Sequence, residues 1–356
     1  MDLADAPEEA RLRAEIRAWL EQHAKPRTAG SADRADDPAA IEHSRRWQRT
    51  KWEAGWAGLT WPREHGGQGR PLIHQIIWDQ EAAAFDVPEE AFIVSTMLAG
   101  PTIVDVGTAE QQARHLPPIL DGRAIWCQLF SEPGAGSDLA AVSTRAVRDG
   151  DGWVVTGQKV WSSGAHYADW GLLLARTDPT APKRHGLTYF LLDMRSPGIT
   201  TRPIRQITGA EHFNEVFLDE VRVPDTDRLG APGEGWRIAR ITLHHERAGL
   251  ALRRRVEIDA FLQLAATTTV SGRPAMSDAR IRDQVARIWM RAEALRHLSY
   301  RSLTAVAHGQ PPGPESSARK LASARLINDV GRLAVTILGR SAVAADDPRG
   351  TYWQRA

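Results

Sequence analysis

The sequence predicts an α+β protein with a helical N-terminal domain (residues 1–122), a middle β-barrel-like domain (residues 123–230) and a helical C-terminal domain (residues 231–356). Three observations support this prediction. Apolar residues recur at helical spacing in both end regions. Short β-branched or apolar runs, separated by turn residues, fill the middle. The chain of 356 residues is also long for a single hydrophobic core.

The N-terminal domain is expected to be mainly helical. Pro7 followed by two glutamates suits a first helical turn, because proline lacks only an unneeded N–H and acids are favoured near the positive end of the helix dipole. Helical spacing returns over 73–85 and 109–120. The segments 28–38 and 61–69 are predicted loops, since both are rich in glycine and other turn residues.

The middle domain is expected to contain several short strands. Frequent Gly, Pro, Asp and Asn residues separate the runs, which is typical of a β-barrel or sandwich-like domain. Pro224 is expected near the end of this domain, because proline cannot donate to a strand ladder. The predicted strands are 153–156, 171–175, 187–192 and 216–218.

The C-terminal domain is expected to hold long helices over 236–266, 278–308 and 315–341. Long helices with short breaks indicate an antiparallel bundle. The last complete helix is expected to end near Gly339, and 346–350 is predicted to be a polar loop.

Composition excludes several classes of protein. The net charge of +1 and the lack of any block of like charges do not point to a nucleic-acid partner. The longest uncharged apolar stretch, 92–104, is too short to span a bilayer and contains a proline. No signal peptide is visible, and the single Cys127 rules out an internal disulfide and most thiolate metal sites. We therefore expect a soluble cytoplasmic protein.

The segment from Phe130 to Asp138, with the sequence FSEPGAGSD, is the first candidate for a binding site. It predicts a strand end followed by a glycine-rich turn, and such turns expose backbone N–H groups that can cradle anions. Its glycine spacing matches neither a Walker loop nor a dinucleotide fingerprint. On the residues alone, an ordinary surface turn remains the alternative.

Five motifs in order give the chain a resemblance to the acyl-CoA dehydrogenases. The resemblance implies an N-terminal helical domain, a middle β-domain and a C-terminal four-helix bundle, with FAD between the last two. It covers nearly the whole chain. The motifs lie at 55–69, 122–138, 157–164, 221–224 and 235–247.

The same resemblance implies a set of cofactor-binding residues. The strand beside the flavin ring would run from Trp126 to Ser131, with the Ser131 hydroxyl near flavin N5. The turn after it would meet both the flavin and the CoA moiety of the substrate. Plain core packing is the alternative for the tryptophan at 161. The residues implied are Trp126, Gln128, Phe130, Ser131, Gly136, Ser137, Trp161 and Ser163, with Ser137 also binding substrate.

The resemblance also implies the reaction, in which a base removes a proton from Cα of an acyl thioester while hydride leaves Cβ for flavin N5. Glu246 matches the base of members similar to isovaleryl-CoA dehydrogenase. Leu243, Glu246, Arg247 and Leu250 share one helical stripe, where a desolvated carboxylate would have a raised pKa. A glutamate that is exposed, or paired to another helix, is the alternative.

Two further assignments follow from the same helix. Arg247 matches a family arginine near the CoA chain, so we expect it to bind substrate. His244 and His245 are adjacent, and adjacent helical side chains point about 100° apart. They cannot chelate as an i, i+4 pair would, and we expect no metal site.

The chain departs from the resemblance near its end. Family members continue beyond the position of Tyr352–Ala356 through a glycine-threonine segment and a final helix, so we expect either a truncated chain or a partner subunit that completes the site. The arginine-aromatic-glycine flavin motif of the partner subunit, which family members carry after the first C-terminal helix, is also not evident. Residues 271–275 occupy that region instead, which leaves FAD affinity open.

The expected partners are an acyl-CoA substrate, an electron-transfer flavoprotein as electron acceptor, and further subunits in a homo- or hetero-oligomer arranged as a dimer of dimers. Two alternatives to a dehydrogenase remain. One is a non-catalytic or half-site subunit of a heteromer, and the other is a flavin monooxygenase on the same fold. The acyl group stays open among straight, branched and steroid-derived acids.

Overall fold

The computed structural model describes residues 5–27, 37–207, 209–253, 258–307, 313, 315–344 and 348–355. The chain forms two compact units. We call them the central unit and the helical unit. The central unit comprises Asp33–Arg70 and Pro88–Glu246, and the helical unit comprises Met1–Ala32, Pro71–Val87 and Arg247–Ala356.

Two helices of the central unit, α2 and α5, begin at clear capping residues. The Asp37 side chain accepts a hydrogen bond from Ala39 N–H at the start of α2. Thr108 and Gln111 form a reciprocal capping box at the start of α5, which confirms the predicted helix at 109–120. The helices are α2 (Pro38–Glu53), α4 (Gly100–Val106), α5 (Ala109–Leu120) and the first part of α6 (Gly235–Arg253).

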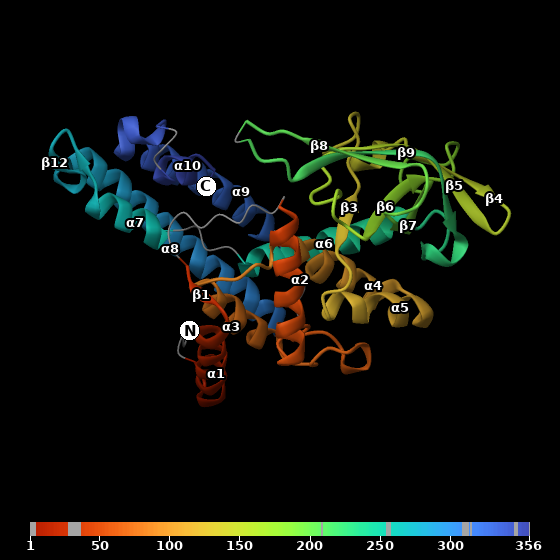
Figure 1. The fold of residues 1–356 in the computed structure, drawn as a ribbon, viewed down its shortest axis with the longest axis horizontal. Coiled ribbons are helices and arrows are strands. Elements are labelled where there is room, and N and C mark those ends of the chain that lie inside the picture. The colour runs from red at the N-terminus through yellow and green to blue at the C-terminus, as the bar shows by residue number, and fades with distance from the viewer. Residues whose placement is uncertain are drawn as a thin grey trace. The chain divides into compact units, whose positions relative to one another are not determined.

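An eight-stranded sheet forms the rest of the central unit, with the order β10-β7-β6-β4-β5-β9-β8 and with β3 paired to β6 in parallel (Figure 1). All four predicted strands are present. The strands are β3 (Trp126–Leu129), β4 (Arg145–Asp149), β5 (Gly152–Lys159), β6 (Trp170–Arg176), β7 (Leu187–Asp193), β8 (Ile199–Ile204), β9 (Phe213–Pro224) and β10 (Arg228–Leu229).

Both faces of the sheet are covered by apolar side chains. Successive side chains of a strand point to opposite faces, so Trp126 and Leu129 on β3 belong to different core clusters. The cluster around Trp126 also contains residues of α4, α5 and α6, which pack on that face. The second cluster, around Leu129, is made of the strands and the turns that join them. The helices therefore cover one face of the sheet.

The helical unit has its own core, made by α7, α8, α9 and α10. In its N-terminal part, Glu81 on α3 accepts hydrogen bonds from Arg13 and Arg17 on α1. Short strands β1 (Lys25–Pro26) and β2 (Phe85–Asp86) pair beside these helices. The helices are α1 (Pro7–His23), α3 (Leu72–Ala82), α7 (Ile258–Thr267), α8 (Ala279–Ala307), α9 (Glu315–Leu338) and α10 (Pro348–Arg355).

One detail differs from the sequence prediction, and two predictions fall partly on residues outside the described part of the chain. Over the predicted helix at 236–266 the structure describes α6 and α7, and the residues between them, 254–257, lie outside the described part of the chain. The predicted loop at 346–350 is wrong from Pro348 onward, because α10 begins there. The predicted loop at 28–38 lies largely outside the described residues. Within the described part of the chain, no helix has the length and apolar character needed to cross a bilayer.

Candidate functional site

The glycine-rich turn after β3 is closed by two backbone hydrogen bonds. Glu132 N–H donates to Ala135 O at 2.9 Å, and Ala135 N–H donates to Glu132 O at 3.0 Å. Gly136 and Ser137 follow and are exposed. A Cβ atom added at Gly134 or Gly136 would meet no atom within 4 Å. The backbone of this turn is therefore open to a ligand, as an anion- or cofactor-binding turn requires.

A buried ion pair between Lys159 and Glu132 holds the start of the turn in place. Lys159 is 0% exposed and Glu132 is 6% exposed. The ammonium of Lys159 donates to Glu132 Oε1 at 2.8 Å, to Phe130 O at 3.0 Å and to Leu174 O at 2.7 Å. Burial lowers the pKa of Lys159 to about 8, against the attraction of Glu132. Burial would raise the pKa of Glu132, but the charge of Lys159 and hydrogen bonds to the carboxylate bring it to about 2. Both groups are thus charged at neutral pH.

The segment after β5 presents Trp161 and Ser163 to the surface. Trp161 is 58% exposed and has a left-handed backbone with φ 61°, which is strained for a bulky residue. Paired hydrogen bonds between Ser162 and Asn214 fix this turn. The Ser162 hydroxyl is buried and has no hydrogen-bond partner among the described residues. Val160 N–H donates to Ser131 O at 2.9 Å, so this segment lies beside the glycine-rich turn.

The side chains of β3 are largely enclosed. The Trp126 indole is 1% exposed and stacks on Trp170 with ring centroids 5.7 Å apart. Phe130 is 4% exposed and meets the ring of Tyr189 edge-on. Gln128 keeps a buried amide nitrogen that no described residue satisfies. Trp126 and Phe130 can therefore serve a cofactor chiefly through the backbone that they anchor, while Gln128 Nε2 and Trp126 Nε1 are both buried donors without a described partner.

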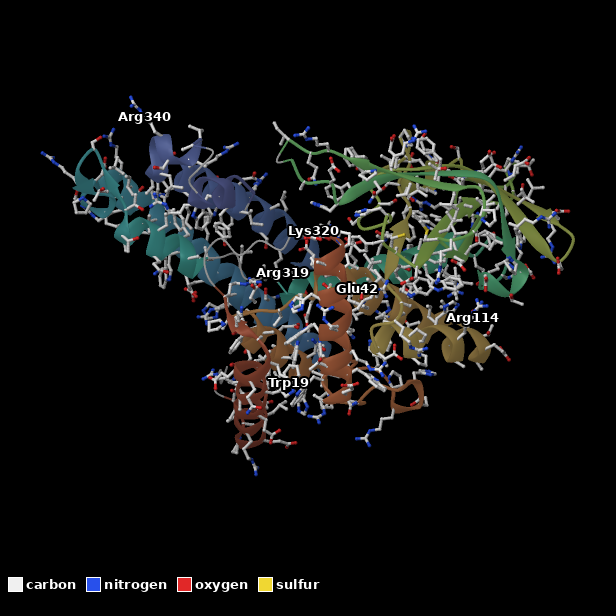
Figure 2. The ribbon with its side chains drawn as sticks, in the orientation of Figure 1. Trp19, Glu42, Arg114, Arg319, Lys320 and Arg340 are labelled. Atoms are coloured by element: carbon white, nitrogen blue, oxygen red, sulfur yellow. The ribbon has the colours of Figure 1, made fainter. Side chains whose placement is uncertain are left out.

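His115, on α5, is a buried polar residue that sequence reasoning missed. Its ring packs edge-on against Trp126 and Trp170, and its Nε2 accepts a hydrogen bond from Arg114 Nε at 2.9 Å. Arg114 also pairs with Asp227 and is labelled on α5 in Figure 2. Burial, with Arg114 adding to it, lowers the pKa of His115 to about 3, so the imidazole is neutral at ordinary pH. A single histidine in a predicted helix carries no sequence pattern from which its burial against two tryptophans could be predicted.

Helix α6 is tied to the sheet by buried hydroxyl groups. Thr102 Oγ1 donates to Thr242 Oγ1 at 3.0 Å, and the Tyr189 hydroxyl lies 3.0 Å from the same atom. Glu246 follows one helical turn after Thr242 and is half-buried. Since Tyr189 also packs on Phe130, the helix that carries Glu246 and the segment that leads from β3 to Ser131 share one buried connection.

The other residues near Glu246 on α6 are only partly described. Leu243 packs against the core cluster of the helix-covered face. His245 Nε2 lies 2.8 Å from Asp105 Oδ2, so it bonds to α4. The side chains of Arg247 and Leu250 lie outside the described residues, and the structure does not place them.

These features together fit a flat ligand rich in hydrogen-bonding atoms. The fit rests on an exposed indole at Trp161, an open backbone at Gly134 and Gly136, and two of the buried polar atoms that have no described partner, Gln128 Nε2 and Ser162 Oγ. All of them lie in the central unit, at or next to the contact between Ser131 and Val160. Buried polar groups are nearly always satisfied, so the two orphaned atoms are consistent with contacts made by a ligand.

The chain resembles known proteins in its domain families, its sequence and its fold. Family models match residues 6–123 ("Acyl-CoA dehydrogenase, N-terminal domain"), 127–221 ("Acyl-CoA dehydrogenase, middle domain") and 233–356 ("Acyl-CoA dehydrogenase, C-terminal domain"). The chain is 38% identical over 351 residues to "Acyl-CoA dehydrogenase IpdE1" of Mycobacterium tuberculosis, covering 97% of this chain and 89% of that protein.

Two solved structures are similar over the whole chain. One is titled "Tcur3481-Tcur3483 steroid ACAD", with a TM-score of 0.82 and 30% identity, covering 100% of this chain and 92% of that one. The other is the ChsE4-ChsE5 complex from Mycobacterium tuberculosis, with a TM-score of 0.80 and 28% identity, covering 100% of this chain and 93% of that one.

Proposed function

The chain belongs to the acyl-CoA dehydrogenase family of oxidoreductases, and on that premise we propose that it binds FAD and converts an acyl-CoA thioester to the 2,3-enoyl-CoA. The observation that carries this proposal is the buried link from Phe130 through Tyr189 to Thr242. It joins the strand proposed to lie beside the flavin to the helix that bears the proposed base, one turn before Glu246.

Glu246 is the proposed general base. Its carboxylate would take the proton from Cα of the acyl group, which is the part of the reaction that needs a positioned protein base. FAD, when bound, would supply the acceptor for the hydride that leaves Cβ. The hydroxyls of Ser131 and Ser163, the amide of Gln128 and the indole of Trp161 would hold the flavin. Gly136 and Ser137 would meet the flavin and the CoA moiety, with Arg247 beside the CoA chain.

The proposal extends to substrate class and partners. The Tcur3481-Tcur3483 protein is described as a steroid ACAD and is 30% identical over the whole chain, which supports a steroid-derived acyl-CoA as the substrate here. Both similar structures carry the names of two proteins, which supports a heteromeric assembly. We propose an electron-transfer flavoprotein as the electron acceptor.

The test uses the purified chain in its natural assembly. FAD should co-purify or be taken up, and an anaerobic acyl-CoA should bleach its visible band with formation of the 2,3-enoyl thioester. A panel of straight, branched and steroid-derived thioesters then ranks the substrates. Absence of bleaching by every thioester, in protein that carries FAD, would contradict the proposed activity. Stronger bleaching by a short straight chain would contradict the steroid proposal alone.

A further inference from the structure

We propose that Lys159 and Glu132 form a positioning pair for the cofactor site, which holds Ser131 and the glycine-rich turn in the shape that FAD binds. The inference rests on the proposed function, because it assigns a role toward the same cofactor. It concerns residues that would not touch the flavin, since both side chains are enclosed by protein.

The first support is that both neighbours of Ser131 are held by one ammonium group. Lys159 Nζ donates to Phe130 O at 3.0 Å and to Glu132 Oε1 at 2.8 Å. Its third proton goes to Leu174 O at 2.7 Å, on the strand that pairs with β3. A lysine has three donors, so all three are used. Ser131 itself is fixed by the hydrogen bond from Val160 N–H to its carbonyl oxygen at 2.9 Å.

The second support is that Glu132 closes the loop that contains the exposed turn. Its Oε2 accepts from the backbone N–H of Ser143 at 2.7 Å and from the Ser143 hydroxyl at 2.8 Å. Its Oε1 accepts from Thr144 N–H at 2.9 Å. One carboxylate therefore joins the two ends of the segment 132–144, and the exposed residues Gly136 and Ser137 lie between them.

The third support comes from the energetics of buried charge. Removing two charges from water costs several kcal/mol, and an apolar pair of similar volume often stabilises a core as well or better. An ion pair with 0% and 6% exposure is therefore a poor way to gain stability alone. It does fix directions, because each charge must meet its donors or acceptors at defined distances. Lys159 also lies two residues before Trp161, so the same pair connects the turn to the exposed indole.

The experiment compares three variants with the wild type. Glu132→Gln keeps the size of the side chain but turns an amide NH2 toward groups that donate hydrogen bonds. The double variant Lys159→Met with Glu132→Leu removes both charges and leaves no unpaired one. The matched control is Lys51→Met, which breaks a largely buried pair with Glu89 (2.6 Å) elsewhere in the central unit.

Three quantities are measured on FAD-depleted protein: the dissociation constant of added FAD, the hydrogen-exchange rate of amides in 133–138, and the thermal midpoint. We expect Glu132→Gln and the double variant to weaken FAD binding at least fivefold and to speed exchange in 133–138 at least fivefold. We expect the control to change neither by more than twofold, at a comparable loss of thermal midpoint.

The outcomes distinguish the positioning role of the ion pair from the proposed function of the chain. A smaller change than fivefold in the folded double variant, or an equal loss of FAD affinity in Lys51→Met, overturns the positioning role. If both site variants fail to fold while the control folds, the pair is a stability element and the positioning role is overturned as well. A wild-type protein that takes up no FAD contradicts the proposed function, whereas normal uptake by wild type and variants alike contradicts this inference only.

Discussion

Replacing His115 by glutamine should reduce the loss of unfolding free energy that the central unit shows as the pH falls. The imidazole is 2% exposed, and burial lowers its pKa from 6.5 to about 3. Between these two pH values the unfolded chain binds a proton that the folded protein does not bind. Stability must therefore fall as the pH falls through this window, by about 1.4 kcal/mol for each pH unit and by at most about 5 kcal/mol in all.

The substitution also has a cost that does not depend on pH. His115 meets Trp126 and Trp170 edge-on, with ring centroids 5.2 and 4.5 Å apart, and each such contact contributes about 0.5–1.5 kcal/mol. Glutamine can still accept the hydrogen bond from Arg114. We therefore expect the variant to be less stable than wild type by about 1–3 kcal/mol at pH 7.5. At pH 4.5 the wild type has lost about 3 kcal/mol through this histidine, so the difference should vanish or reverse.

The assay is urea unfolding followed by tryptophan fluorescence at pH 7.5, 6.0 and 4.5. His43→Gln removes an exposed histidine of the same unit and serves as the control. The reasoning is refuted if His115→Gln and wild type differ by the same free energy at all three pH values. It is also refuted if the gap widens toward acid.

Three further substitutions test the packing around the site. Tyr189→Phe removes a hydroxyl that lies 3.0 Å from Thr242 Oγ1, and it should lower the free energy of unfolding by about 1 kcal/mol in urea titrations; an unchanged midpoint would speak against a buried hydroxyl link. Gly100→Ala would place a Cβ 1.9 Å from Cη2 of Trp61 and should lower the free energy of unfolding by about 1–3 kcal/mol or more. Gly134→Ala, with open space around its Cβ, should leave the free energy of unfolding nearly unchanged in the same urea titrations. Equal losses in the two alanine variants would contradict this packing.

The sequence predicts best those strands whose burial is continuous. The runs at 171–175 and 187–192 stand out because β6 and β7 are buried on both faces. By contrast, β4 (Arg145–Asp149) is mostly exposed and β8 (Ile199–Ile204) has no buried residue. Both carry charged or polar residues, so no apolar run marks them. Their place in the sheet comes from pairing with β5 and β9, which is a long-range property.

Long-range contacts also limit how much of the candidate site the sequence predicts. The glycine pattern of 134–136 and the motif order predicted where a cofactor turn would lie. Nothing in the sequence links Glu132 with Lys159, because they meet only where the end of β3 and the end of β5 come together. Hydropathy also argues against burying either residue. The helix α10 had a local signal that was available, since its first residue is Pro348 and proline is favoured at that position.

The most direct test of the proposed chemistry is the rate at which a saturating acyl-CoA bleaches the flavin without oxygen, compared between wild type and Glu246→Gln at equal FAD content. A positioned general base contributes about 10²–10⁴-fold to proton transfer. The account predicts that Glu246→Gln retains FAD and its thermal midpoint but is bleached at least about 100-fold more slowly. Bleaching within tenfold of the wild-type rate would contradict the assignment of Glu246 as the base.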